Sequence, residues 1–370
     1  MKLTAVVKLL PTDDQYRALL ATLERANAAC NWLSKQAWQI KAFGQFGLHK
    51  LYYRDMRQQF ELSAQMAVRC IGKVADSYKK DRQTLRQFKP HGAAAYDSRI
   101  LNWRLPDQQV SIWTLSGRST VNFTCAKHHE LLLHYQQGES DLVYRKGKFF
   151  LYTTCEVPED TPLDVEGFLG VDLGVVNIAA DSDGEVYSGA VVNGVRHRHR
   201  RLRTKLQKKG TKSAKRLLKK LSGKERRFAN QVNHTISKVI AAKAQGTLRG
   251  IALEDLSGIR ERITARKPQR AALHSWSFYD LRAKIEYKAK RAGVPVALVD
   301  PRNSSRTCPQ CGCVDKHNRP NQSTFKCVSC GFSGLADTIA AGILARRAAF
   351  NQPYAVSVSA LAQTEFGTAT

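Results

Sequence analysis

Hydrophobic and polar positions along this chain change period several times, and each period predicts a different element. The segment Leu3–Leu10 is a short apolar run with β-branched residues, which predicts a strand. Thr12 and Gln15 form a capping-box signature, and the apolar positions that follow recur at helical spacing to about Gln39, which predicts a long helix. More helix is expected from about Leu51 to Phe88.

The pattern changes between about Ala93 and Glu156, where short alternating runs are separated by Gly and Lys-Gly turns. Such runs predict the strands of a small β-barrel, and they include Val110–Leu115, Ser119–Thr124, Leu131–Tyr135 and Phe149–Thr154. The proline-flanked stretch 158–162 predicts a linker. Beyond it, a strand at Gly170–Gly174 and a hairpin partner with a turn at Asp181–Gly184 are followed by helix, strand, helix and strand.

Three acidic residues lie in contexts that can bring them together. Asp172 lies within the apolar run Gly170–Gly174, Glu254 ends the run Gly250–Glu254, and Asp337 opens an alanine-rich helix. Oxygen ligands are those that Mg²⁺ prefers, and two ions about 3.5–4 Å apart can hold the attacking and leaving oxygens of a phosphodiester. Each acid taken alone fits a surface or cap position equally well. Their shared context, with this order of elements, indicates an RNase H-like nuclease.

Four cysteines form two knuckles, Cys308-Pro-Gln-Cys311 and Cys327-Val-Ser-Cys330, which are separated by fifteen residues. That spacing is typical of a zinc ribbon, in which four thiolates close a tetrahedral site around one Zn²⁺. A closed site of this kind is structural, because no position stays open for water or substrate. Cys313 is expected to be a free thiol. The total of nine cysteines fits a reducing compartment better than a disulfide framework.

Charge adds a partner to this picture. The chain has 370 residues and a formal net charge of +28, with 59 Lys and Arg against 31 acids. Such an excess implies a polyanionic partner, most often nucleic acid, whose phosphates the cations neutralise. No run reaches the roughly 18 apolar residues of a membrane span, and the first residues lack the pattern of a signal peptide. We therefore expect no membrane partner and a cytoplasmic location.

The positive charge is densest between Arg196 and Arg227, where about half of the positions are Lys or Arg and Glu225 is the only acid. A solvated helix face usually mixes both signs, so this density predicts contact with nucleic acid. Leucines at helical spacing and a break at 210–214 predict a pair of helices. The basic stretch Arg260–His274 is expected to form a mobile lid. The expected phosphate contacts are Arg200, Arg201, Arg203, Lys205, Lys208, Lys209, Lys219, Lys220, Arg266 and Lys267.

In combination, these motifs resemble the TnpB family of transposon-encoded RNA-guided DNA endonucleases, which are related to the miniature type V CRISPR-Cas effectors. The shared order is Gly-Val-Asp-Leu-Gly at 170–174, Ile-Ala-Leu-Glu-Asp-Leu at 251–256, Ser-Trp-Ser-Phe at 275–278, Ser-Ser-Arg-Thr at 304–307, both knuckles, and an Asp that opens an Ala-Ala helix. These motifs cover roughly residues 165–345. The first half resembles the family in order only. Where the family commonly has Asp-Arg-Asp-Glu-Asn-Ala-Ala, this chain keeps Asp337 as the sole acid of 334–341, so the neighbouring polar contacts are expected to differ.

The resemblance implies an α+β multidomain fold, in which a RuvC (RNase H-like) nuclease domain with a zinc-ribbon insert follows a wedge-like β-barrel that carries a helical recognition lobe. Asp172, Glu254 and Asp337 would be the RuvC acids that hold two Mg²⁺. The implied domains are 1–12 and 93–163 for the wedge, 13–92 for the recognition lobe, 164–302 and 335–350 for the nuclease, and 303–334 for the ribbon over target nucleic acid. Composition predicts that the tail, 351–370, is disordered.

The implied partners are a guide RNA and target double-stranded DNA, which a monomer would bind. The resemblance also implies a prokaryotic cell, with the protein at the nucleoid when it is bound to DNA. Base pairing with the guide would select the target, and the protein would read a short flanking motif. In relatives the helical lobe reads that motif, and the candidates here are Lys50, Tyr52, Tyr53, Ser63 and Gln65.

Two other functions remain open at this point. One is an RNA-guided repressor that binds DNA without productive cleavage, and the intact acid triad weighs against it. The other is an unguided RNase H-like nuclease or a transposase, and the long first half weighs against it because a bare nuclease does not need it.

Overall fold

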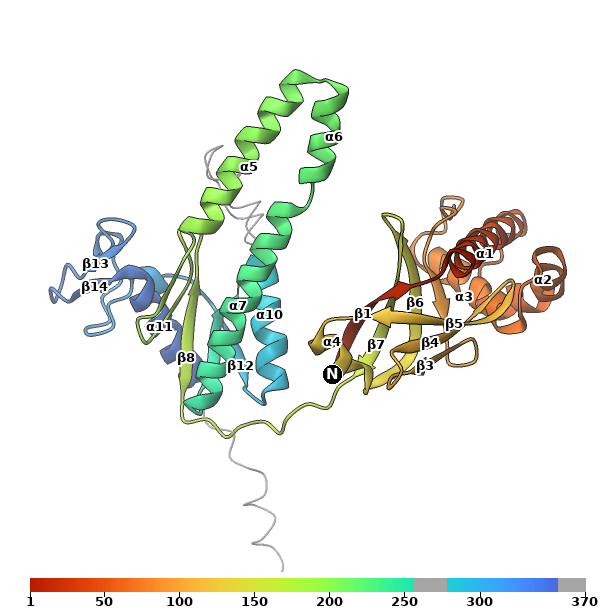
Figure 1. Cartoon of the computed structure of the whole chain (residues 1–370). Coiled ribbons are helices and arrows are strands. Elements are labelled where there is room, and N and C mark those ends of the chain that lie inside the picture. The colour runs from red at the N-terminus through yellow and green to blue at the C-terminus, as the bar shows by residue number, and fades with distance from the viewer. Residues whose placement is uncertain (256–277, 352–370) are drawn as a thin grey trace, which may run out of the picture. The chain divides into compact units, whose positions relative to one another are not determined.

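The structure is a computed structural model that describes residues 1–255 and 278–351 (Figure 1). The chain divides into two compact units, Met1–Pro158 and Glu159–Thr370. The expected lid at Arg260–His274, with Arg266 and Lys267, and the expected disordered tail from residue 352 onward lie outside the described residues.

The first unit is built on one antiparallel sheet of seven strands. Its strand order is β2-β6-β7-β1-β5-β4-β3. The sheet curls so that β2, at one end, approaches β4, next to the other end, and the hydroxyl of Tyr96 on β2 donates to the carbonyl oxygen of Trp113 on β4 at 3.2 Å. This nearly closed sheet confirms the predicted small barrel. Its strands are β1 (Lys2–Leu10), β2 (Ala94–Tyr96), β3 (Leu101–Arg104), β4 (Gln109–Thr114), β5 (Gly117–Thr124), β6 (Gln136–Arg145) and β7 (Lys148–Glu156).

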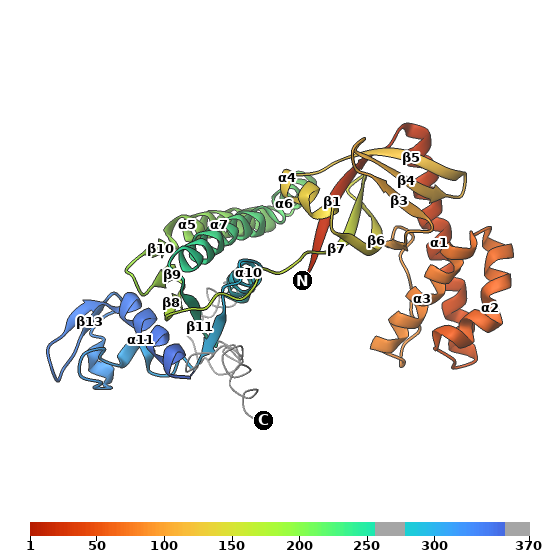
Figure 2. The same cartoon turned by 90° about the horizontal axis from the view of Figure 1, so that it is seen from below.

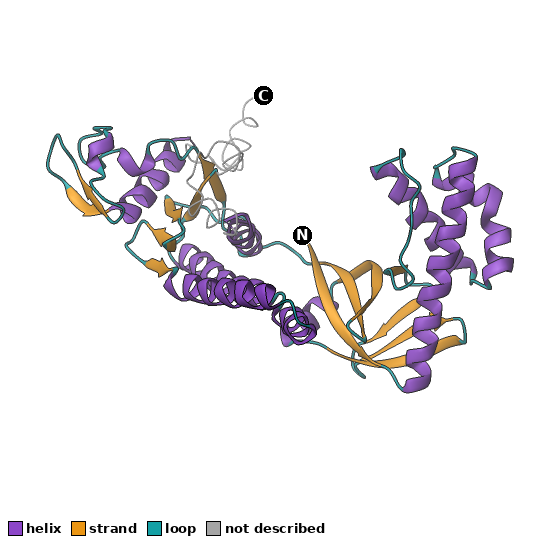
Figure 3. Ribbon diagram, turned by 90° about the horizontal axis from the view of Figure 1, so that it is seen from above, coloured by secondary structure: helices purple, strands orange, loops and turns teal. Residues whose placement is uncertain are grey.

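Three helices lie between β1 and β2 in sequence and share a core with the sheet (Figure 3). They are α1 (Asp13–Gln39), α2 (Gln45–Phe60) and α3 (Ala64–Lys80). The capping box of Thr12 and Gln15 is present, and the hydroxyl of Thr12 accepts a hydrogen bond from the Gln15 backbone. The predicted start and end of the first helix are confirmed. The helix expected from about Leu51 to Phe88 is two helices that begin at Gln45 and end at Lys80, so the expectation of helix at 81–88 is wrong.

One sequence expectation in this unit is wrong. The segment Leu131–Tyr135 does not form a strand, because Lys127–Leu133 is helix α4. Leu132 and Leu133 are buried while Leu131 is 65% exposed, so the alternation expected of a strand is absent. Three consecutive leucines satisfy a helical face as well as a strand, and the local sequence does not separate the two.

The second unit is a five-stranded sheet with helices on both faces. Its strands are β8 (Phe168–Leu173), β9 (Asn177–Asp181), β10 (Val186–Ser188), β11 (Gly250–Glu254) and β12 (Val296–Val299), in the order β10-β9-β8-β11-β12. Strand β11 runs parallel to β8 and to β12, and β9 is antiparallel to its neighbours. The predicted order of strand meander, helix, strand, helix and strand is confirmed.

The two faces of this sheet are covered by different helices (Figure 2). Leu169 and Leu253 point to the face that α7 (Lys224–Gly246) and α10 (Phe278–Arg291) cover. Ala252 points to the other face, against Leu344 of α11 (Ala336–Asn351). Helices α5 (Ala190–Lys209) and α6 (Lys212–Leu221) form a hairpin that projects from the sheet, as expected for the basic segment (Figure 1).

Between β12 and α11 lies a small loop-rich insert. It contains the short helices η1 (Ser304–Arg306) and η2 (Lys316–Asn318) and the hairpin of β13 (Thr324–Lys326) with β14 (Ser333–Leu335). Its core joins Cys308, Phe325 and Cys327 to Ala336 and Ile339, which already belong to α11. The insert and the first turn of α11 therefore form one packed body. Within the described parts of the chain, no helix has the length and apolar character of a membrane span.

Candidate active site and metal centre

Asp172 and Glu254 lie side by side at the carboxyl ends of two neighbouring parallel strands. The register of β8 and β11 pairs Val171 with Leu253, so the next residue on each strand is the acid. Side chains alternate along a strand, which turns both acids to the face that α11 covers. Strand pairing alone thus places two of the three predicted acids together.

The third acid reaches this face because β8 and α11 touch backbone to backbone. A Cβ atom added to Gly170 would lie 1.8 Å from the carbonyl oxygen of Ala341, so only glycine lets the helix rest on the strand. Asp337 is one helical turn before Ala341, and Asp172 is two residues beyond Gly170 on the same face. The close contact therefore brings the first turn of α11 to the pair of strand acids.

The three acids act on one another electrostatically. Burial raises the pKa of Asp172 well above its usual range, and the negative charges of Glu254 and Asp337 raise it further. Burial also raises the pKa of Glu254, and the charge of Asp337 adds to this effect. The positive charge of Arg319 opposes the shift of Asp172 without cancelling it.

Hydrogen bonds orient these carboxylates. The backbone N–H of Leu173 donates to Oε1 of Glu254 at 2.8 Å. Both oxygens of Asp337 are engaged, since Nδ2 of Asn177 donates to Oδ2 at 2.9 Å and the guanidinium of Arg319 donates to Oδ1 at 3.0 Å. Sequence reasoning missed Asn177 and Arg319. Asn177 follows Asp172 by five residues within one motif, which was a usable signal, whereas nothing local marks Arg319.

The chemistry of this donor set fits a hard divalent cation. All three side chains offer oxygen, and burial together with the neighbouring carboxylates raises the pKa of Asp172 and of Glu254. Among the described residues, only one group of three or more His, Cys, Asp or Glu side chains has all its ligand atoms within 4.8 Å of one another, and that group is the four ribbon cysteines. The three carboxylates do not form so compact a group.

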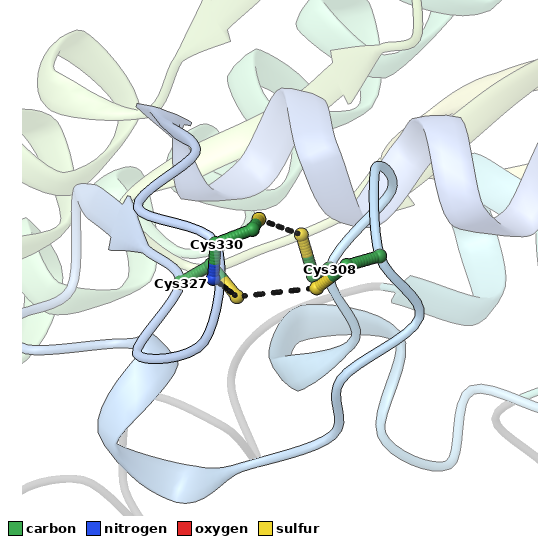
Figure 4. Close-up of side chains that lie close together, drawn as sticks. Cys308, Cys327 and Cys330 are labelled. Atoms are coloured by element: carbon green, nitrogen blue, oxygen red, sulfur yellow. Dashed lines mark hydrogen bonds between the residues drawn. The ribbon is translucent and has the colours of Figure 1, made fainter.

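The four predicted zinc ligands converge in the insert (Figure 4). The sulfurs of Cys308 and Cys330 lie 3.5 Å apart, as do those of Cys311 and Cys327. Tetrahedral coordination with Zn–S bonds of about 2.3 Å needs sulfurs about 3.8 Å apart, which is close to this spacing. The backbone N–H of Cys330 lowers the pKa of the Cys327 thiol to about 6, which favours the thiolate that binds metal. Cys313 stands outside this set.

The insert is connected to the carboxylate site through Asn318 and Arg319. The fully buried side chain of Asn318 donates to the carbonyl oxygens of Arg306 and Cys313 and accepts from the N–H of Val328, so it ties both knuckles together. The next residue, Arg319, is the one that reaches Asp337. The fold of the insert therefore determines where this guanidinium lies.

The basic helices present a continuous cationic surface. The eight predicted contacts on α5 and α6 are all exposed. One face of α5 lines a groove of about 610 Å³ with His197, Arg200, Arg201, Thr204, Lys205 and Lys208. The carboxylate of Glu225 lies 3.5 Å from the guanidinium groups of Arg196 and Arg203, so it offsets positive charge only at the base of the hairpin. The described geometry suits the tracking of a phosphate backbone.

The five residues expected to read a flanking motif have different surroundings. Lys50 is exposed on α2, and Tyr53 of the same helix stacks on His49 with ring centroids 4.6 Å apart. Tyr52 packs edge-on against Trp32. Ser63 caps α3. Both ends of the Gln65 amide are engaged, with Asp97 and with Arg99.

Known families match most of the second unit. A family model described as Probable transposase matches residues 152–257, and a model of the Cas12f1-like TNB domain matches residues 278–344. The TnpB-like protein MJ0751 of Methanocaldococcus jannaschii is 32% identical over 191 residues, which are 48% of this chain and 68% of that protein. This chain belongs to the TnpB family.

Other relatives of this TnpB-family chain are CRISPR-associated endodeoxyribonucleases. Cas12f1 of Sulfoacidibacillus thermotolerans is 32% identical over 227 residues, which are 56% of this chain and 52% of that protein. Cas12f1 of Syntrophomonas palmitatica is 30% identical over 243 residues, 60% of this chain and 48% of that protein. The chain thus spans about half the length of these curated relatives.

A solved Cas12f1–sgRNA–target DNA complex has a TM-score of 0.55 to this structure at 16% sequence identity. The match covers 88% of this chain and 82% of the Cas12f1 chain. At that identity the likeness shows the shared α+β fold and nothing about activity.

Proposed function

We propose that this TnpB-family chain is an RNA-guided DNA endonuclease that hydrolyses target DNA beside a short flanking motif. The observation that carries the proposal is the convergence of Asp172, Glu254 and Asp337 from β8, β11 and the start of α11 on one face of the sheet. Two facts about relatives support an RNA-guided function. Some relatives carry the name endodeoxyribonuclease, and the solved Cas12f1 complex contains RNA and DNA.

In this proposal the second unit is a RuvC-type nuclease domain, and its three acids hold two Mg²⁺. When bound, the two ions lower the pKa of the attacking water and stabilise the leaving 3′ oxygen. Asp172, on whose pKa both other acids act, would hold the ions together with Glu254 and Asp337. Leu173 donates to Glu254, and Asn177 and Arg319 donate to Asp337. No protein group is proposed as a general base, because metal-bound water would supply the nucleophile.

The insert would hold one structural Zn²⁺ through Cys308, Cys311, Cys327 and Cys330. Its role would be to keep Arg319 and the first turn of α11 in place, because both belong to the same packed body as the cysteines. The basic face of α5 and α6 would follow the phosphates of the guide and target strands.

We further propose that the first unit combines the wedge-like sheet with the recognition lobe, and that the helices read the flanking motif. Lys50 and Tyr53 on α2 are better candidates than Gln65, whose amide already bonds within the protein, or Ser63, which caps a helix. Guide RNA and target double-stranded DNA are the proposed partners.

A cleavage assay with matched and mismatched targets, with and without the RNA that copurifies with the protein, tests the proposal. We expect cutting of the matched target only, and only with RNA and Mg²⁺. Equal cutting of both targets without RNA would instead favour an unguided nuclease. Tight target binding with no cutting under any metal condition would favour the repressor.

Variants at neighbouring acids sharpen this test. Asp172→Ala should abolish cleavage while RNA and target binding remain, because it removes a metal ligand and little packing. Asp255→Ala is the matched control, since Asp255 follows Glu254 directly and its carboxylate pairs with Arg282 at 3.1 Å. That control should cut within about threefold of the wild-type rate, as expected of a surface ion pair.

A further inference from the structure

Asn177 links the first predicted motif to the third acid. It lies at the start of β9, and its side-chain Nδ2 donates to Oδ2 of Asp337 at 2.9 Å, across a separation of 160 residues. The other oxygen of Asp337 faces Arg319. The carboxylate is thus held from two sides, by an amide from the sheet and by a guanidinium from the insert.

The turn before Asn177 has little conformational freedom. A Cβ atom on Gly174 would lie 2.6 Å from the carbonyl oxygen of Asn177, so the turn closes tightly over that glycine. Nδ2 of Asn193 donates to the carbonyl oxygen of Val175 at 3.0 Å and holds the turn from α5. The backbone therefore aims the Asn177 amide at Asp337.

The two contacts on Asp337 differ in what they do to its charge. The Arg319 guanidinium brings a positive charge that competes with a cation for the carboxylate. The Asn177 amide is neutral, so it fixes the orientation of the carboxylate and leaves its negative charge available. Hydrogen bonds of this kind to metal ligands typically change metal affinity or activity by roughly 10- to 100-fold.

We propose that Asn177 is a positioning residue that orients Asp337 for binding a divalent cation. This inference rests on the proposed function and deepens it. The six residues Asp172–Asn177 would then supply both a metal ligand and the group that orients a second ligand on another element.

The test uses full-length protein purified with its RNA and zinc, and Mn²⁺ as the probe, read by electron paramagnetic resonance. The Mn²⁺ binding that Asp172→Ala abolishes defines the carboxylate site. Asn177→Leu, of similar size without the amide, should weaken that binding by about tenfold or more. Asn233→Leu is the matched control, because it removes another amide that donates to a carboxylate, Oδ2 of Asp280 at 2.8 Å, between α7 and α10 on the opposite face of the sheet. It should change the binding by less than about threefold.

Cleavage provides a second readout that a merely structural role would not reproduce. For Asn177→Leu we expect the Mg²⁺ concentration at half-maximal rate to rise about tenfold, with most of the rate recovered at saturating Mg²⁺. Asn177→Ser, which keeps a donor hydroxyl, should lie between this variant and the wild type, and it replaces Asn177→Leu if that variant does not fold by circular dichroism.

The failures of the two proposals are distinguishable. If Asp172→Ala removes no Mn²⁺ binding, the two-metal nuclease is rejected, and the role of Asn177 with it. If binding depends on Asp172 but is equal in Asn177→Leu and Asn233→Leu, only the positioning role is rejected.

Discussion

A single methyl group on β8 should inactivate the proposed nuclease. In Gly170→Ala the new Cβ would lie 1.8 Å from the Ala341 carbonyl oxygen, whereas real Cβ atoms essentially never come closer than 3.0 Å. Strand and helix must therefore separate by at least about 1.2 Å, and neither contact atom belongs to a flexible side chain. Because Asp337 is one turn from Ala341 on α11, its carboxylate moves with the helix away from Asp172.

The expected losses follow from this displacement. A misplacement of about 1 Å at reacting groups costs on the order of 100-fold in rate, so single-turnover cleavage should fall by about that factor. Overpacking of this kind costs about 1–3 kcal/mol of stability, and each kcal/mol lowers the melting temperature by about 2–4 °C in a domain of this size. RNA binding should remain, because the substitution lies far from the basic face of α5 in the fold of the second unit.

The assay compares Gly170→Ala with Gly342→Ala, a methyl group added one residue after Ala341 on the same helix. A Cβ on Gly342 meets no atom within 4 Å, so this control should cut at the wild-type rate and melt no lower, since Ala favours helix by about 1 kcal/mol. Cleavage by Gly170→Ala within twofold of the wild-type rate would refute the idea that this close contact sets the position of Asp337.

Three further outcomes are expected. Cys308→Ser should lose zinc and loosen the packed insert that holds Arg319 and Asp337, so cleavage should fall although no cysteine is catalytic. Elemental analysis of wild-type protein purified without chelators checks the ribbon. Less than about half an equivalent of zinc would count against it. The raised pKa values of Asp172 and Glu254 mean that protons compete with metal for these carboxylates, so cleavage should be lost as pH falls through a range above that of ordinary carboxyl groups. A higher Mg²⁺ concentration should move this loss to lower pH. A pH profile of cleavage that does not change with Mg²⁺ concentration would contradict this. A further variant neutralises the basic face by replacing Arg200, Arg201, Lys208, Lys209, Lys219 and Lys220. It should weaken the binding of all guide sequences equally and leave the discrimination against mismatched targets unchanged. The slope of log affinity against log salt should flatten by about 0.7–0.9 per lost phosphate contact.

Features that depend on neighbouring residues could be predicted from the sequence. The capping box at Thr12 and Gln15 places the start of α1, because its hydrogen bonds span only three residues. The two cysteine knuckles predict their own convergence, since each turns two thiols inward within four residues. The apolar runs that contain Asp172 and end in Glu254 predict buried strands, and the parallel pairing that the structure adds brings the two acids together.

Features that depend on contact between distant segments could not be predicted in this way. The run at Leu131–Leu133 satisfies a helix and a strand equally, and packing in the first unit selects the helix. The flanking-motif candidates were chosen by type and place, yet Gln65 bonds to Asp97 and Arg99, which lie more than thirty residues away.

The sequence by itself determined most of the elements, the two cysteine knuckles, the acids that are candidate metal ligands, and that the chain resembles TnpB proteins. Only the tertiary structure decided how the third acid is held. Asn177 reaches Asp337 across 160 residues, and Arg319 reaches it from the insert. The physical reason is that a hydrogen bond depends on distance and direction in space, and these are set by the packing of α11 on Gly170 and not by the residues adjacent to the donor.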